Sequence, residues 1–405
     1  MFLNKLKTGY KVKINYNLII TFVGVAVILI FAYLANQTPA KQSITIGYSE
    51  DTVKAEVVSI LEQGTVQLGE VNQTFQVAKL RVLEGDYQGH DYTIEYGKNY
   101  IYTSDYLLKP GEEIYVSVGQ MPDGETSIIF IDFVRTNALL ILGLVFVLVC
   151  VLVSGWKGVR SLIGIGVSVL VIIFFIIPQI LKGQNPILIS LIGSIFFLAV
   201  TQYLVFGWTL KTHISIFSIL ICILITGIIA FIFVDLAHLN GMGDENSMYI
   251  LQKFNYLNVK NLLIAGIIIG SLGLLDDLVV GQTSAVIEIY RADPEMKFTQ
   301  RLKRAMNIGR DHVAATVNTL VLAYLGASIS LFLLFSNSNT PVATILNFNY
   351  LAEAIVRSLV GTIGLFISVP VTTVLACWVV DDYQRLGKFV RIFGPLLNSS
   401  EAHHE

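Results

Sequence analysis

Hydrophobic residues occur along the chain in long runs that polar segments separate. Eight runs of about 18 to 24 predominantly apolar residues have the length that a helix needs to cross a bilayer core. They lie at residues 18–35, 138–156, 162–180, 187–206, 214–234, 262–285, 314–335 and 358–379. The pattern predicts a polytopic α-helical membrane protein with about eight transmembrane helices.

A different pattern fills residues 41–135, between the first and second apolar runs. Residues 114–118 (IYVSV) and 129–133 (IFIDF) alternate between apolar and polar positions, and turn sequences such as 109–111 (KPG) separate the alternating segments. Alternation of period two with Gly and Pro between the segments is typical of antiparallel strands. We therefore expect a small all-β domain, a barrel or a sandwich. The tyrosines of residues 87–106 either form a binding face or simply cover the sheet, because tyrosine is favoured in strands.

Composition agrees with this division of the chain. Of the 405 residues, 54% are hydrophobic and 14% are charged, which excludes an ordinary cytosolic enzyme. Residues 41–135 hold 22 charged residues, a share typical of a soluble domain, and the other 310 residues hold 34. The near balance of 27 Lys and Arg against 29 Asp and Glu gives no indication of a nucleic-acid partner.

The distribution of Lys and Arg predicts the orientation in the membrane. With eight spans and both termini in the cytoplasm, 16 basic residues fall on the cytoplasmic side, and only 4 fall on the other side apart from the β-domain. We thus expect a basic start and anchor helix at 1–40 and an extracytoplasmic β-domain at 41–135. A seven-helix bundle at 136–380 and a cytoplasmic tail at 381–405 complete the expected organisation.

Two adjacent carboxylates, Asp276 and Asp277, lie inside the sixth apolar run. Ionisable side chains inside a membrane are costly and are functional candidates by default. The two side chains point about 100° apart on a helix, so one can face a polar cavity while the other contacts a neighbouring helix. Asn318 and Thr319 of the next run are candidates to stabilise a charged carboxylate. The alternative is that polar neighbours such as these merely satisfy the aspartates at a packed interface.

The outer loop after the fifth run carries a second polar group. His238, Asp244 and Glu245 are candidate cation contacts, although a hydrated loop with no ligand explains the same residues. Residues 241–244 (GMGD) also match the GxGD signature of intramembrane aspartyl proteases. We predict no metal site and no cofactor, because the chain has no Walker A, dinucleotide-binding or HExxH motif.

Basic and apolar residues mix in the inner loop 288–313. This mixture predicts an interfacial amphipathic helix. Such a helix either anchors the chain at the membrane surface or couples the sixth and seventh spans.

The block at residues 270–335, which begins GSLGLLDDLVVGQTSAVIEIYRADPEMKF, resembles the signature region of the YibE/F family of bacterial multispan proteins. The likeness extends over the chain to the ending VGTIGLFISVPVTTVLAC at 360–377. It implies a bacterial cytoplasmic membrane location and the multispan architecture, but no established activity.

A more distant likeness links the sixth run to a helix of SecD/SecF and of the resistance-nodulation-division exporters. Their G-x-x-x-D-x-V-V pattern, with its proton-carrying aspartate, is matched by Gly273, Asp277, Val279 and Val280. Asp276 stands one position earlier. The likeness implies proton coupling at Asp277, but eight spans instead of six and a small outer domain prevent any transfer of substrate.

These features together predict ion-coupled transport or export, in which Asp277 takes up a proton and Asp276 supports it. The rival hypothesis is a scaffold or signalling protein, not an enzyme, whose outer domain binds an envelope partner. The third hypothesis is an intramembrane aspartyl protease. The expected partners are the lipid bilayer, a second copy of the chain or of a family member, and an envelope protein.

Overall fold

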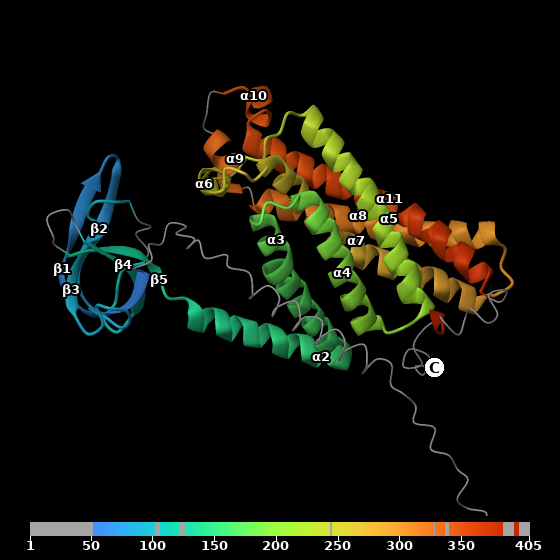
Figure 1. Cartoon of the computed structure of the whole chain (residues 1–405), viewed down its shortest axis with the longest axis horizontal. Coiled ribbons are helices and arrows are strands. Elements are labelled where there is room, and N and C mark those ends of the chain that lie inside the picture. The colour runs from blue at the N-terminus through green and yellow to red at the C-terminus, as the bar shows by residue number, and fades with distance from the viewer. Residues whose placement is uncertain are drawn as a thin grey trace, which may run out of the picture. The chain divides into compact units, whose positions relative to one another are not determined.

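The computed structural model describes residues 52–101, 106–120, 126–243, 245–327, 329–336, 340–383 and 393–396. The chain divides into two compact units, Lys41–Leu152 and Met1–Ala40 with Val153–Glu405. The strands belong to the former and most of the long helices to the latter (Figure 1). The first apolar run at 18–35, Asp244 and most of the expected tail lie outside the described residues.

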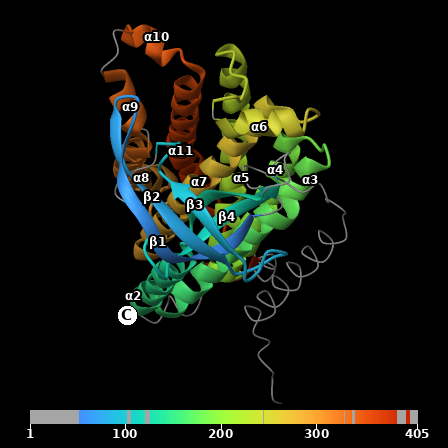
Figure 2. The same ribbon diagram turned by 90° about the vertical axis from the view of Figure 1, so that its left-hand side faces the viewer.

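The smaller unit contains a sheet of five antiparallel strands in the order β3-β2-β1-β4-β5. Figure 2 labels β1 to β4 of this sheet. The strands are β1 Thr52–Leu68, β2 Val71–Val82, β3 Asp91–Tyr96, β4 Glu113–Gln120 and β5 Thr126–Phe133. Register shifts within β1 bend that strand, and the outer strands β3 and β5 approach each other. The sheet is therefore a partly closed barrel, as in five-stranded OB-type barrels. The predicted all-β domain is confirmed.

Alternate side chains of the central strands form the core of this barrel. Ala55, Leu80 and Val116 are fully buried, as the period-two pattern requires. Tyr96 also belongs to this core, because its ring packs against Phe130 with the centroids 4.9 Å apart. The tyrosines of this region therefore do not form one common face.

A long helical segment follows the barrel. The helix α2, Thr136–Val171, is interrupted at Gly155, whose φ of 55° and ψ of −136° are not helical. A π-helical turn, Ile172–Ile176, joins it to α3, Ile177–Leu181. The second and third apolar runs thus lie in one element, Thr136–Leu181, with the break at Gly155, near the end of the second run.

The remaining helices form the bundle of the larger unit. They are α4 Pro186–Phe206, α5 Leu210–Leu236, α6 Glu245–Lys253, α7 Val259–Ala292, α8 Phe298–Ala327, α9 Ile329–Ser336, α10 Val342–Leu346 and α11 Asn349–Asp381. Side-chain oxygens of Asn185, Thr209 and Asn258 accept hydrogen bonds from the first-turn N–H groups of α4, α5 and α7. These capping residues begin three of the apolar helices where the polar connections end.

α7 is the central helix of the bundle, because it packs against α4, α5, α8 and α11. α7 and α11 both run from the end of the bundle that holds Lys260 to the end that holds Arg301. These are called the Lys260 end and the Arg301 end below. At the Arg301 end a C-terminal segment contacts the start of α5, where the Leu210 N–H donates to the Pro395 carbonyl over 2.9 Å.

Within the described residues, five helical elements are long and apolar enough to cross a membrane. They confirm a helical membrane protein, but they do not confirm the predicted count of eight. The first run lies outside the described residues, and the second and third runs count as one element, Thr136–Leu181, although the backbone is not helical at Gly155. The seventh run is divided between α8 and α9. The first half of α8 is too polar for this helix to count as a membrane-crossing helix.

Candidate functional site

Asp276 lies on the side of α7 that faces α4. It is partly buried, and its carboxylate accepts a hydrogen bond from the side-chain amide of Gln202. Gln202 is 2% exposed and belongs to α4, whose length and apolar composition qualify it as a membrane span. An amide donor buried beside a carboxylate stabilises the charged form at a place where water cannot reach it freely.

The amide oxygen of Gln202 has no hydrogen-bond partner within the described part of the chain. The buried hydroxyls of five further residues also have no described partner: Ser190 and Ser194 of α4, Ser218 of α5, and Thr362 and Thr372 of α11. A buried polar atom without a partner costs about 1–3 kcal/mol. Several such atoms in the helices around α7 give this apolar bundle a partly polar interior.

A second polar layer lies one to two turns closer to the Arg301 end. The hydroxyl of Ser215 on α5 donates to Thr283 of α7 over 3.2 Å. The amide of Gln282, also on α7, donates to Thr373 of α11 over 2.7 Å and to the Ala305 carbonyl of α8 over 2.9 Å. Polar contacts therefore join α7 to three neighbouring helices at this level.

Asp277 occupies a different side of α7 from Asp276. It is exposed, and it shares a helical face with Gly266, Gly270 and Gly273, which are exposed too. A Cβ atom built on any of these glycines would meet no described atom within 4 Å. The two aspartates therefore have unlike environments, as the 100° angle between neighbouring positions allows.

Asn318 and Thr319 of α8 are both exposed. The hydroxyl of Thr319 donates to the Ala315 carbonyl of its own helix over 3.1 Å. Over the residues that the structure describes, no hydrogen bond joins Asn318 or Thr319 to either aspartate. Gln202, which the sequence reasoning missed, holds Asp276 instead. The sequence feature that could have identified Gln202 is its polar amide near the end of the apolar run at 187–206.

Arg301 is the second residue whose environment the sequence reasoning missed. The prediction for residues 288–313 was an interfacial helix that either anchors the chain or couples the sixth and seventh spans, and it did not separate Arg301, which is 0% exposed, from the other basic residues. Its guanidinium donates to Asp381 of α11 and to the Met296 carbonyl, the latter over 2.9 Å. Residues 288–292 belong to α7, and α8 starts at Phe298, so the loop couples the two helices through a buried arginine.

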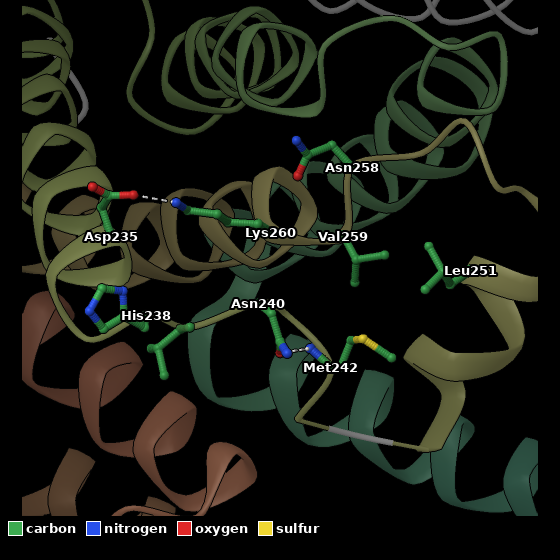
Figure 3. A pocket seen from close by; sticks show the side chains of 9 residues that line it. Asp235, His238, Asn240, Met242, Leu251, Asn258, Val259 and Lys260 are labelled. Atoms are coloured by element: carbon green, nitrogen blue, oxygen red, sulfur yellow. Dashed lines mark hydrogen bonds and ion pairs between the residues drawn. The ribbon is translucent and has the colours of Figure 1, made fainter.

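The Lys260 end of the bundle contains the candidate outer-loop residues. His238 lines an open cavity of about 380 Å³ together with Asp235, Asn240, Asn258 and Lys260 (Figure 3). Asp244 lies outside the described residues, and the side chain of Glu245 is not described. No group of three or more metal-ligating side chains occurs in the described part of the chain.

A buried carboxylate, Glu353 of α11, holds the glycine-rich loop next to this cavity. It accepts hydrogen bonds from the N–H groups of Gly241 and Gly243 and from the side chain of Asn349, the last over 2.9 Å. Gly241 has a φ of +80°, and a side chain there would collide with the Val259 carbonyl. At Gly243 a side chain would meet the carboxylate of Glu353, so close packing accounts for both glycines of the GMGD string.

The comparison with protein families agrees with this architecture. A family model described as YibE/F-like protein matches residues 142–382, from within α2 to the residue after α11. No curated protein and no solved structure matches the chain. The more distant likeness to SecD/SecF stays a prediction. The match extends over more than half of the sequence, and the chain is therefore a multi-pass membrane protein that belongs to the YibE/F-like family.

Proposed function

We propose that the protein couples proton movement to the transport or export of a solute across the bacterial cytoplasmic membrane, with Asp276 as the coupling group. The observation that carries the proposal is the contact between Asp276 and Gln202. It places a carboxylate against a buried amide in the central helix of an apolar bundle. Intramembrane carboxylates of this kind are rare and mark proton and ion pathways.

The chemistry of the Gln202 side chain suits a group that changes its protonation state. The amide nitrogen donates to an ionised carboxylate, which is the arrangement observed. After rotation by 180°, the amide oxygen accepts from a protonated carboxylic acid. That oxygen has no other described partner, so the rotation breaks no described hydrogen bond of the oxygen. The contact therefore persists in both protonation states.

The polar groups around Asp276 support a route for protons along α7. Ser190 and Ser194 lie on α4 on the Lys260 side of Gln202, and the Thr283–Ser215 pair lies on the Arg301 side of Asp276. Hydroxyl groups both donate and accept hydrogen bonds, so they relay protons when water joins them. Asp276 would exchange protons with both ends of the bundle through these groups.

α11 provides the element that would move. It packs closely on α5 and α7 at Gly364 and Gly361, and Pro370 removes one backbone hydrogen bond from its interior. A proline of this kind permits a helix to bend. Protonation of Asp276 would keep the contact with Gln202 but remove a negative charge from the interior beside α7, and α11 would respond because it packs against α7. The expected second copy and envelope partner remain predictions.

Proton flux into proteoliposomes tests this proposal. Full-length protein is reconstituted with a pH-sensitive dye inside the vesicles, and pH gradients and membrane potentials are imposed in both directions. We expect flux from the wild type and its loss in Asp276→Asn. Asp277→Asn, a matched change at the adjacent exposed carboxylate, should retain most of the flux. The proposal is wrong if the wild type moves no protons under any gradient or if Asp276→Asn equals the wild type.

A further inference from the structure

The cavity at the Lys260 end has the dimensions of a small-molecule site. Its volume is about 380 Å³, and it lies between the end of α5, the loop that follows it, α6 and the start of α7 (Figure 3). Pockets for small ligands span about 300–1,000 Å³. Asp276 lies 16 residues further along α7, about 24 Å from Lys260 at 1.5 Å per residue. The cavity is thus distinct from the coupling site.

Two opposite charges line one side of the cavity. The ammonium of Lys260 extends from α7 to the carboxylate of Asp235 on α5, at 2.5 Å (Figure 3). The side chain of Asp235 remains 67% exposed and that of Lys260 33% exposed. The attraction between two side chains that are this exposed to water contributes little net free energy. Each charged group is therefore able to accept a ligand group of opposite charge.

Hydrogen-bond donors surround Lys260. The side-chain oxygens of Asn240 and Asn258 accept from the backbone N–H groups of Met242 and Asn261, both over 3.0 Å. Each asparagine therefore has its NH₂ group left to donate elsewhere. The start of α7 adds the partial positive charge of a helix N-terminus. This side of the cavity consequently favours a carboxylate.

Apart from His238, the rest of the lining is apolar. Leu239, Met242, Leu251 and Val259 line the cavity, and Leu239 and Val259 are buried beneath it. An aliphatic ligand group placed against these side chains would leave water, which favours binding. The chemistry of the cavity therefore combines a positive group, a negative group and an apolar wall within one small volume.

The loop that contributes to this lining is held in a defined shape. His238 has a φ of 52°, and within the described residues no other non-glycine residue has a positive φ. The side chain of Asn349 donates to Asn240 over 2.9 Å, and Glu353 holds the two neighbouring glycines. Asn349 and Glu353 both belong to α11, so these hydrogen bonds fix the loop to that helix. A preorganised wall reduces the entropy lost on binding.

We infer that this cavity binds a small zwitterion with an aliphatic side chain, an amino acid or a dipeptide in size. The ligand carboxylate binds Lys260 and the asparagine amides, and its ammonium binds Asp235. The aliphatic group packs against Met242 and Leu251. The inference deepens the proposed function by naming the class of solute, and it rests on that function only for the transport step.

Calorimetric titration of the full-length protein in lipid nanodiscs tests the ligand chemistry. The probes are L-leucine and L-leucyl-L-leucine, with 4-methylpentanoate lacking the ammonium and 3-methylbutylamine lacking the carboxylate. We expect at least one zwitterion to bind saturably and both analogues of leucine to bind at least about tenfold more weakly than that zwitterion. Failure of both zwitterions to bind, or equal binding of an analogue, overturns the inference. This series requires no variant and is independent of folding effects.

Two charge-removing variants locate the binding site. Lys260→Met and Asp235→Asn should each weaken zwitterion binding by about tenfold or more. Lys182→Met, at an exposed lysine of the same end outside the cavity, should not change it. The unliganded unfolding midpoint of each variant verifies its fold. Undiminished binding to both folded variants overturns the assignment.

These experiments test zwitterion binding and proton coupling independently. Saturable zwitterion binding without proton flux in proteoliposomes upholds the inference and refutes proton coupling. Proton flux without any zwitterion binding refutes the inference and upholds proton coupling.

Discussion

The guanidinium of Arg301 donates to the carboxylate of Asp381, the last residue of α11, and so joins α8 to α11 at the Arg301 end. The same guanidinium lies over the ring of Tyr290 on α7, 4.9 Å from its centroid. One fully buried side chain thus connects the ends of three helices. In sequence, it is indistinguishable from the neighbouring basic residues of the α7–α8 region.

Removal of Asp381 should destabilise the bundle. Asp381→Ala leaves the buried guanidinium without its charged partner, and we expect a loss of about 2–3 kcal/mol, the magnitude of a hydrogen bond to a charged group. Arg301→Lys should also destabilise the protein, because an ammonium cannot reproduce the planar stacking and the forked hydrogen bonds. Thermal unfolding in detergent measures both effects. Arg304→Lys, at an exposed position one turn away, is the control, and equal stability of the Arg301 and Arg304 variants would contradict this role.

Gly309 of α8 should not tolerate a side chain. A Cβ atom there would come within 2.7 Å of the Gln282 amide oxygen and still closer to Val369 of α11. We expect Gly309→Ala to destabilise the protein by about 1–3 kcal/mol, as is typical of overpacked interiors. Gly326→Ala on the same helix meets no described atom within 4 Å and should be neutral or stabilising by up to about 1 kcal/mol. Similar unfolding midpoints for the two variants would refute close packing at Gly309.

The contact between α5 and α11 should depend on Gly364 and Thr226 together. A Cβ atom at position 364 would lie 3.3 Å from the methyl group of Thr226 and closer to its hydroxyl oxygen. Gly364→Ala alone should therefore destabilise the bundle. Combination with Thr226→Ala should restore part of the loss, with a coupling energy of about 1 kcal/mol or more in a double-mutant cycle. Strict additivity of the two changes would show that the helices do not meet at these residues.

The barrel should contain an ion pair that loses its effect in acid. Hydrogen bonds from Arg81 and Lys79 lower the pKa of Asp91 to about 2. Because the pKa in the folded state lies below the usual value of about 3.9, the resulting stabilisation is complete above that value and disappears as the pH falls toward 2. Asp91→Asn should reduce the protection of barrel amides against hydrogen exchange at pH 6 and have little effect near pH 2. Asp86→Asn, in an exposed turn, is the control, and a pH-independent effect of Asp91→Asn would contradict the assigned pKa.

Local patterns were sufficient for much of the fold. The period-two alternation around residues 114–118 predicted β4 because neighbouring strand residues point to opposite faces. The apolar runs at 187–206 and 214–234 predicted α4 and α5 because a helix in lipid must satisfy its backbone internally. These properties depend on residues close together in sequence.

The candidate site required the tertiary structure. Asp276 and Asp277 are chemically identical neighbours, and the likeness to a proton-carrying motif favoured Asp277. The position of Gln202, 74 residues away in sequence, favours Asp276. The direction in which each carboxylate points depends on how α4 and α7 pack, and no local pattern contains that information.

The sequence by itself determined the class of the protein, its all-β domain, its apolar helices and its membership of the YibE/F-like family. Hydrophobic length and periodicity decide the class, the all-β domain and the apolar helices, because they act within single segments, whereas the particular residues of the matched region, 142–382, carry the family membership. Only the tertiary structure decided that Arg301 is buried, that Glu353 holds the glycine-rich loop and that Asp276 faces a buried amide. Each of these depends on contacts between helices that are distant in sequence, where geometry selects one partner among many of similar chemistry.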